Sequence, residues 1–468
     1  MLAFAPFGLH PLALLSFALL VHLWMHALPR RAAWLGFWFG LGLYLAGASW
    51  VYVSMNHFGG MWGPIAALCT LGFCAFLALF PALAGWLQAR IPASDALRAT
   101  LLIPAAWLLF EWMLSWIFTG FPWLALGYSA AGWPLQGYAP LGGAYAVSFI
   151  TLSIAGMLWL VVQRRPLFLV PIVALVGIGE GLRHVPWTTP HGEPFEAALL
   201  QGNIDQELKF RPDRAERILA SYARLADGTR ARLIIFPETA LPVFLDRIDR
   251  GYLAHLEAIG RRNQGDLLVG VPYREGRNYY NSVISLGASP RQVYHKVHLV
   301  PFGEFVPPGF RWTLDIMSIP LSDFSRGAPD RPPLSLVGQR VAVNVCYEDV
   351  FGAEIARSLP EATLLVNVSN VAWFGDSLAP AQHLNIARLR AIETGRMYLT
   401  ATNTGITAAI DRDGRVLKSL PQFAEGRLEV RAQGYSGATP YVRLRDWPVV
   451  LISLALLAGA VIRARITR

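Results

Sequence analysis

The stretch Val341-Ala-Val-Asn-Val-Cys-Tyr-Glu-Asp349 joins a short apolar run, rich in β-branched residues, to a cysteine and three polar side chains. Such a run is typical of a strand that is buried on both faces of a sheet. In layered α/β domains the loops at strand ends carry the chemistry. We therefore expect Cys346 at the end of a buried strand, either as a nucleophile beside carboxylates or as a structural cysteine.

The same pattern extends to both sides of this stretch, through residues 195–435. Further apolar runs predict strands at 197–200, 233–236, 267–271, 282–286 and 363–368. Polar stretches with helical periodicity lie between several of them, at 211–226, 251–263 and 383–396. Residues 407–417, with a glycine turn at 411–414, predict a hairpin. The pattern favours a layered α/β domain.

Glu238 is a second candidate for a chemical role. It follows the predicted strand 233–236 and a proline, so it leaves the sheet at a defined turn. A carboxylate in this place can act as a general base. It can also be an acid in the first turn of a helix, favoured by the helix dipole. The local sequence leaves both interpretations open.

Lysine is rare in this chain, which has 37 arginines and only three lysines, Lys209, Lys296 and Lys418. Arginine cannot replace lysine where a compact charge, or a group able to lose its proton, is required. Lys296 lies in the polar, turn-rich segment 294–304, and there we expect a functional role. Lys209 and Lys418 lie in ordinary solvated contexts, so we expect both at the surface.

Charged residues divide the chain into three parts. Residues 1–183 hold only ten charged side chains, whereas residues 184–446 hold 58, about 22%, which is normal for a soluble domain. Residues 447–468 are an apolar run followed by three arginines. Apolar runs of roughly 20 residues, the length that crosses a bilayer, predict membrane spans. There are seven such runs, at 11–28, 33–54, 61–88, 99–118, 139–162, 166–182 and 447–462.

Basic residues indicate the orientation of these spans. Four basic groups follow every second span, at 30–31, 90–98, 164–165 and 463–468. The positive-inside rule places them in the cytoplasm and the domain 184–446 outside it. The net charge of +9 therefore comes mostly from basic residues that indicate membrane orientation, and no nucleic-acid partner is expected. Glu111, inside the fourth span, is either a functional group or the partner of a neighbouring helix.

Glu238, Lys296 and Cys346, in this order, resemble the Glu–Lys–Cys triad of the nitrilase, or carbon–nitrogen hydrolase, superfamily. Longer stretches are similar to one family within it, the apolipoprotein N-acyltransferases. These stretches are 50–54, 119–128, 236–238, 295–304, 346–348 and 367–376. The resemblance implies a polytopic α-helical membrane domain joined to a nitrilase-like αββα sandwich. The chain departs from the family in three respects. It has seven predicted spans, whereas the family usually has eight. Phe210 stands where the family usually has a tryptophan that contributes to activity, and Val371 stands where an aspartate is expected.

The resemblance also implies a two-step acyl transfer without a cofactor. Cys346 would attack the sn-1 ester of a phospholipid, typically phosphatidylethanolamine. The thioester would then acylate the α-amine of the N-terminal diacylglyceryl-cysteine of an apolipoprotein. Glu238 is the expected general base, and Lys296 is expected to stabilise the oxyanion. No zinc-protease, Walker or dinucleotide-binding motif occurs in the sequence, so no metal or nucleotide is expected.

Other side chains are expected to support this site. Glu304 could hold Lys296 in position. Tyr347 and Glu348 follow the cysteine directly, although Glu348 could serve only as a capping acid. By the same resemblance, the protein is expected to be a monomer in the bacterial inner membrane, with its catalytic domain facing the periplasm.

Two apolar segments are candidates for contact with lipid. One is a lid, 310–324, with Trp312 and Met317, and the other is the outer loop 119–133, with Trp123. Ordinary interfacial packing is the alternative for each. Two rival functions are a membrane-tethered nitrilase-type amidase and a non-enzymatic transporter or scaffold. Seven spans argue against the amidase, which needs only one anchor, and an intact triad argues against the scaffold.

A charged lid is expected to keep the acyl donor away from the site. The double substitution Trp312→Asp and Met317→Asp should sharply slow the formation of a thioester from phospholipid, because charged side chains are costly beside acyl chains. The measurement is the rate at which labelled phospholipid acylates the purified protein. An unchanged rate would rule out the lid.

Overall fold

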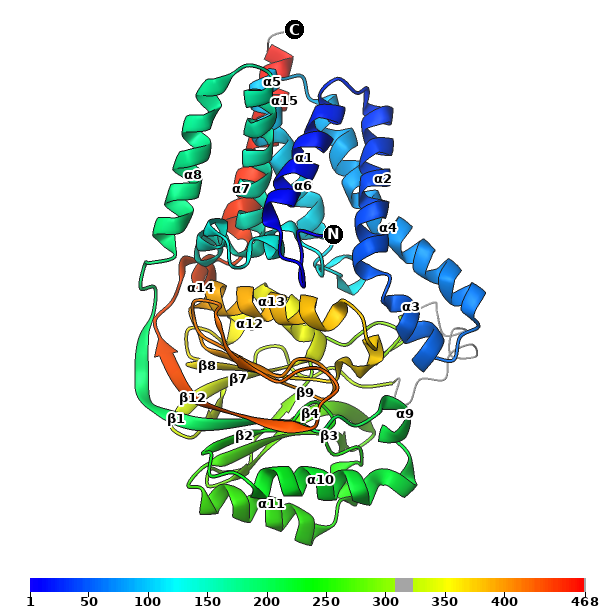
Figure 1. Cartoon of the computed structure of the whole chain (residues 1–468), viewed down its shortest axis with the longest axis vertical. Coiled ribbons are helices and arrows are strands. Elements are labelled where there is room, and N and C mark those ends of the chain that lie inside the picture. The colour runs from blue at the N-terminus through cyan, green and yellow to red at the C-terminus, as the bar shows by residue number, and fades with distance from the viewer. Residues whose placement is uncertain (308–322, 467–468) are drawn as a thin grey trace. The chain divides into compact units, whose positions relative to one another are not determined.

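The computed structural model describes residues 1–307 and 323–466, and within these ranges the chain forms two compact units (Figure 1). The helical unit consists of Met1–Tyr52, Pro64–Pro186 and the chain from Thr439 onward. The sandwich unit consists of Val53–Gly63 and Trp187–Ala438. Trp312 and Met317, of the predicted lid, lie outside the described residues.

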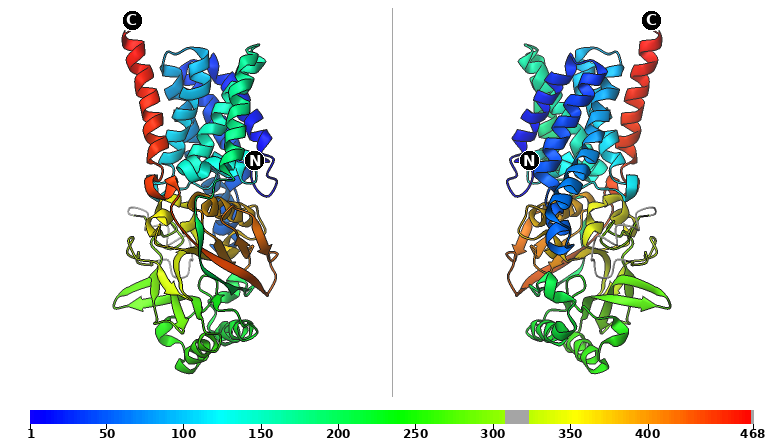
Figure 2. Two further views of the ribbon diagram at one scale, coloured as in Figure 1. Left: turned by 90° about the vertical axis from the view of Figure 1, so that its left-hand side faces the viewer. Right: turned by 90° about the vertical axis from the view of Figure 1, so that its right-hand side faces the viewer.

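Apolar helices make up the helical unit. A helix satisfies its own backbone N–H and C=O groups, which is required in a lipid environment. In chain order the helices are α1 (His10–Met25), α2 (Pro29–Ala48), α4 (Gly63–Arg90), α5 (Asp95–Leu97), α6 (Ile103–Met113), α7 (Ala139–Val162), α8 (Leu169–Leu182), α14 (Pro440–Leu444) and α15 (Trp447–Ile466). Within this unit, α15 packs beside α6 and α7 (Figure 2).

Four helical stretches of the described chain are long and apolar enough to cross a membrane. They are Gly63–Arg90, Asp95–Met113, Pro134–Val162 and Trp447–Ile466. A fifth qualifies if α2 and Val51–Phe58 count as one bent span, and His10–Met25 and Pro166–Leu182 are apolar but shorter. Each predicted span thus coincides with an apolar helix, as expected of a multi-pass membrane protein.

The predicted span 33–54 is not one straight helix, because the chain bends by 57° between Pro29–Ala48 and Val51–Phe58. α2 stops at Ala48, and the chain then forms α3 (Val51–Val53) and a π-helical turn, η1 (Ser54–Phe58). η1 belongs to the sandwich unit, where the Ser54 hydroxyl donates to the carbonyl of Trp373 at 2.7 Å.

Glu111 lies near the end of α6, the helix of the fourth predicted span. This helix ends at Met113, whereas the prediction extended it to residue 118. Its Oε1 accepts the backbone N–H of Leu126 at 2.7 Å and the indole N–H of Trp107 at 3.2 Å. Leu126 belongs to the outer loop 119–133. The contacts therefore favour the structural interpretation of Glu111, as a tether for this loop.

Trp123 lies in the same outer loop and is almost fully buried, with 2% of its surface exposed. Its ring packs against those of Trp50 and Phe121, at centroid distances of 5.0 and 6.3 Å. This packing places Trp123 in an aromatic cluster inside the helical unit. Its contact with lipid stays a prediction.

The sandwich unit contains two six-stranded sheets. The first has the order β12-β1-β2-β3-β4-β5, with β12 (Gly426–Ser436), β1 (Thr189–Gln201), β2 (Leu233–Ile235), β3 (Asp266–Glu275), β4 (Asn278–Gly287) and β5 (Val293–His295). The second has the order β11-β10-β9-β8-β7-β6, with β11 (Val416–Ser419), β10 (Ala408–Ile410), β9 (Tyr398–Thr402), β8 (Leu364–Ser369), β7 (Gln339–Val345) and β6 (Leu334–Leu336). Strands β1, β2 and β3 are parallel, and so are β7, β8 and β9.

Helices cover the outer face of each sheet (Figure 1). α10 (Ala215–Asp227) and α11 (Arg250–Arg262) cover the first sheet, and α12 (Gly352–Ile355) and α13 (Ala379–Thr394) cover the second. The layers confirm the predicted αββα sandwich. The predicted hairpin is also confirmed, because β10 and β11 pair antiparallel.

The central strands are buried on both faces, which explains their continuous apolar sequences. In β1, Ala197 and Leu199 lie in the core between the sheets, whereas Ala198 and Leu200 lie in the core beneath α10 and α11. Alternate residues of β7 join the core between the sheets. The two cores hold the strands rigidly, and polar side chains can therefore be placed accurately at the strand ends.

Loss of the Glu111 carboxylate is expected to destabilise the helical unit, because two buried N–H groups lose their acceptor at a cost of about 2 kcal/mol. Glu111→Leu should lower the apparent Tm of the purified protein. Glu111→Gln should stay near the wild-type value, since its amide oxygen can still accept. Glu180→Leu on α8 is the matched control, because the Glu180 side chain is 44% exposed. Equal Tm values for Glu111→Leu and the wild type would contradict the tether.

Candidate active site

Cys346 stands where β7 ends and the turn η10 (Cys346–Val350) begins. Its φ is 52°, in the left-handed region that costs a non-glycine residue about 1–2 kcal/mol. The Asn367 side-chain amide donates to the Cys346 carbonyl at 3.1 Å and helps to hold this conformation. Residues kept in such strained conformations cluster at active sites. The geometry therefore favours the nucleophile over the structural cysteine.

Glu238 lies beyond the end of β2 in a turn and not in a helix, so the helix-dipole interpretation does not hold. The carboxylate is buried, and each oxygen has a fixed donor. Oε1 accepts the Asn281 amide and Oε2 accepts the Asn370 backbone N–H, both at 2.7 Å. Lys296 Nζ lies 3.5 Å from Oε1. These contacts hold the carboxylate in one orientation, as a general base requires.

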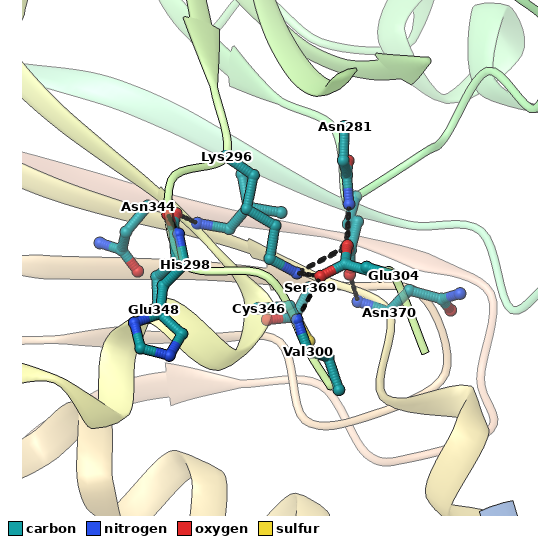
Figure 3. A network of polar contacts seen from close by, with 12 residues as sticks. Asn281, Lys296, His298, Val300, Glu304, Asn344, Cys346, Glu348, Ser369 and Asn370 are labelled. Carbon is teal, nitrogen blue, oxygen red and sulfur yellow. Dashed lines mark hydrogen bonds and ion pairs between the residues drawn. The ribbon is translucent and has the colours of Figure 1, made fainter. Parts of the chain in front are cut away.

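Lys296 is buried, and its ammonium points toward Glu304 (Figure 3). Glu304 Oε2 lies 2.8 Å from Nζ, nearer than Glu238 at 3.5 Å. Glu304 is itself held in place, since Oε1 accepts the Asn281 amide at 2.7 Å and Oε2 accepts the Val300 backbone N–H at 2.9 Å. Asn281 thus bridges two carboxylates, and Glu304 lies where it can hold Lys296.

Glu348 joins the segment of Lys296 to the turn of Cys346. Its two oxygens accept four hydrogen bonds of 2.6 to 3.0 Å, from the backbone N–H groups of Val297, His298 and Val345 and from the hydroxyl of Tyr294. The bond from Val345 caps the turn, as the capping interpretation predicts. The other three connect that turn to the segment around Lys296. Tyr347 packs its ring on Phe351, with 5.2 Å between centroids.

The surroundings of Cys346 favour a thiol over a thiolate at rest. Burial, and then the charge of Glu238, raise the pKa of Cys346, against the opposing charge of Lys296. Burial also raises the pKa of Glu238, but Lys296 and Lys209 outweigh it and hold that pKa below its ordinary value. Burial lowers the pKa of Lys296, and Glu304 and Glu238 outweigh it, so this pKa is raised. The resting site therefore pairs a neutral thiol with a charged carboxylate that can accept its proton.

Three polar residues of the site escaped the sequence analysis. Asn281 precedes a predicted strand and Asn370 lies inside the stretch 367–376, yet no pattern marks either as functional. Lys209 was expected at the surface, and this prediction is wrong, because only 2% of its surface is exposed. Its ammonium donates to the backbone carbonyl of Glu238 at 3.0 Å. The rarity of lysine in this chain was the sequence feature that could have indicated a role for Lys209.

The structure brings together most of the predicted site residues. Phe210 follows α9 (Gln206–Lys209) and is partly buried, whereas Trp123 belongs to the helical unit. Within 1–307 and 323–466, no group of three or more His, Cys, Asp or Glu side chains is placed to hold a metal ion. The side chains present offer a nucleophile, a base and a cation, the set that acyl transfer through a covalent intermediate uses.

Both units of the chain are similar to known proteins. Residues 1–157 match the family model of the apolipoprotein N-acyltransferase N-terminal domain, and residues 196–441 match that of carbon–nitrogen hydrolases. An apolipoprotein N-acyltransferase of Nitrosomonas europaea is 48% identical, over 98% of this chain and 94% of its own. One of Methylococcus capsulatus is 46% identical, over 96% of this chain and 91% of its own. A solved carbon–nitrogen hydrolase superfamily protein of Xanthomonas campestris covers 56% of this chain and 97% of its own, with 17% identity and a TM-score of 0.40. The chain belongs to the apolipoprotein N-acyltransferase family.

Proposed function

We propose that the protein transfers an acyl chain from a phospholipid to the N-terminal amine of an apolipoprotein, through a thioester on Cys346. Sγ attacks the ester carbonyl carbon while the thiol proton moves to Glu238. The ester C–O bond then breaks, and Glu238 returns the proton to the oxygen of the leaving lysophospholipid. The α-amine of the diacylglyceryl-cysteine next attacks the thioester. As the C–S bond breaks, an amine proton passes through Glu238 to the sulfur.

The observation that carries this proposal is the fixed orientation of the Glu238 carboxylate, which accepts hydrogen bonds from Asn281 and Asn370 near the partly buried Cys346. A thiol with a raised pKa needs a base at the moment of attack. Lys296 then stabilises the oxyanion of each tetrahedral intermediate. Its charge acts more strongly there than in water, because the site is buried.

The family relation supports a lipoprotein substrate and a membrane setting. Phosphatidylethanolamine as the acyl donor and a monomeric enzyme are our proposals. We propose a membrane domain at 1–183, a catalytic domain at 184–446 and a final anchor at 447–468. The basic groups after every second span support a place in the bacterial inner membrane, with the catalytic domain in the periplasm.

The central prediction is a covalent intermediate on Cys346. Purified protein incubated with labelled phosphatidylethanolamine is expected to acquire an acyl group that hydroxylamine removes, because hydroxylamine cleaves thioesters much faster than amides. Addition of a diacylated lipopeptide should then discharge the label as N-acylated peptide. Peptide mass spectrometry locates the adduct.

Two cysteine variants provide the controls. Cys346→Ala should acquire no label, whereas Cys69→Ala, at an exposed cysteine of α4, should label like the wild type. Labelling of Cys346→Ala would contradict the mechanism. Ammonia release from small amides, with no acyl transfer, would favour the amidase.

Glu304→Gln is expected to slow thioester formation about 100-fold, because Lys296 loses the carboxylate that holds it and small displacements of catalytic groups cost this much. The amide keeps the size of the side chain, so the fold should be retained. Glu257→Gln on α11, where Glu257 pairs with Arg261 at the surface, is the matched control. The readout is the single-turnover rate of acylation, and equal rates in all three proteins would exclude this role of Glu304.

A further inference from the structure

Lys209 is a buried lysine that the mechanism above does not use. It is the last residue of α9, and its ammonium donates to the backbone carbonyl of Glu238 at 3.0 Å. Among the described residues, no carboxylate oxygen lies within 4.0 Å of this ammonium. Lys296 differs in this respect, because Glu304 lies 2.8 Å from its Nζ.

A buried ammonium without a countercharge is unfavourable in a purely structural setting. Its transfer out of water costs free energy unless a carboxylate and hydrogen bonds compensate. A single carbonyl compensates only in part, and methionine would fill a similar volume at no electrostatic cost. A buried cation beside an active site therefore points to an electrostatic role.

The contacts of α9 join it to the backbone of Glu238 and to Asn370, a donor to the Glu238 carboxylate. At the start of the helix, Gln206 accepts the Asn370 side-chain amide at 2.8 Å. The backbone N–H of Asn370 binds Glu238 Oε2. At the end of the helix, Lys209 binds the Glu238 carbonyl. Both ends of α9 thus meet groups that hold Glu238.

We propose that Lys209 is a positioning residue that holds the backbone of Glu238 and keeps its carboxylate charged for the attack by Cys346. The inference rests on the proposed function, in which Glu238 accepts the thiol proton. Lys209 acts through Glu238 and does not contact the substrate. The charge of Lys296 is largely matched by Glu304, whereas the charge of Lys209 remains available to Glu238.

Titratable groups from several elements surround Glu238 and Lys209. They are Lys296 and Glu304 after β5, Cys346 after β7 and His383 on α13. Glu207, on α9 itself, is exposed and lies 3.8 Å from His57. Burial lowers the pKa of Lys209 to about 8, against the opposing charge of Glu238. The lysine is therefore charged below this pH and neutral above it.

The test compares the pH profile of thioester formation in the wild type, Lys209→Met and Lys209→Gln. Without the positive charge the pKa of Glu238 rises, so its carboxylate is protonated at higher pH. The acid limb of the profile should therefore shift upward by about one pH unit. Above pH of about 8 the wild-type lysine has lost its proton, and the ratio of variant to wild-type rates should stop changing with pH. Lys209→Gln keeps a hydrogen-bond donor without a charge and should follow Lys209→Met.

Lys418→Met is the matched control, because Lys418 Nζ also donates to a backbone carbonyl, that of Glu429, at 3.0 Å, but on the surface. Its profile should equal that of the wild type. A ratio of variant to wild-type rates that is constant at every pH would reveal a purely structural role and overturn the inference. A wild-type profile in Lys209→Gln would do the same, and this variant carries the test if Lys209→Met does not fold. If the wild type forms no thioester at any pH, the proposed function fails instead.

Discussion

The buried ammonium of Lys296, set between Glu304 and Glu238, is the interaction on which the rest of the candidate site depends. An unpaired charge at this depth would cost several kcal/mol, so the two carboxylates must be held where they compensate it. Asn281 does this for both, by donating to one oxygen of each. The requirement to compensate one cation thus determines where three side chains from different segments can lie.

The two sheets contribute different parts of the site. The ends of β2 and β5 in the first sheet place Glu238 and Lys296, and the end of β7 in the second places Cys346. The apolar core between the sheets holds these strand ends in a constant relation. Glu348 reinforces that relation, because its carboxylate binds both the cysteine turn and the segment of Lys296. The strained φ of Cys346 is maintained by this rigid surround.

Three buried glutamates of the chain follow one physical rule. Glu111, Glu238 and Glu348 each accept at least one backbone N–H, at 2.6 to 2.7 Å in the shortest bond. Such donors offset part of the cost of burying the carboxyl group, and the carboxyl group at the same time fixes the segment that donates. In the helical unit the fixed segment is the outer loop 119–133. In the sandwich unit the fixed segments are those around Cys346. Buried polar side chains thereby position the backbone of loops that lie outside the apolar cores.

By itself the sequence determined the strands, the apolar helices and the candidates Glu238, Lys296 and Cys346, because apolar periodicity, strand ends and residue rarity are local properties of the chain. Only the tertiary structure decided the partners. Lys209 has polar neighbours in sequence, yet it is buried against Glu238, 29 residues away. Likewise, the predicted span 33–54 looks continuous in sequence, but Ser54 at its end donates to the carbonyl of Trp373 within the sandwich unit. Burial and hydrogen bonding join residues that are far apart along the chain, and no local pattern records which of them will meet.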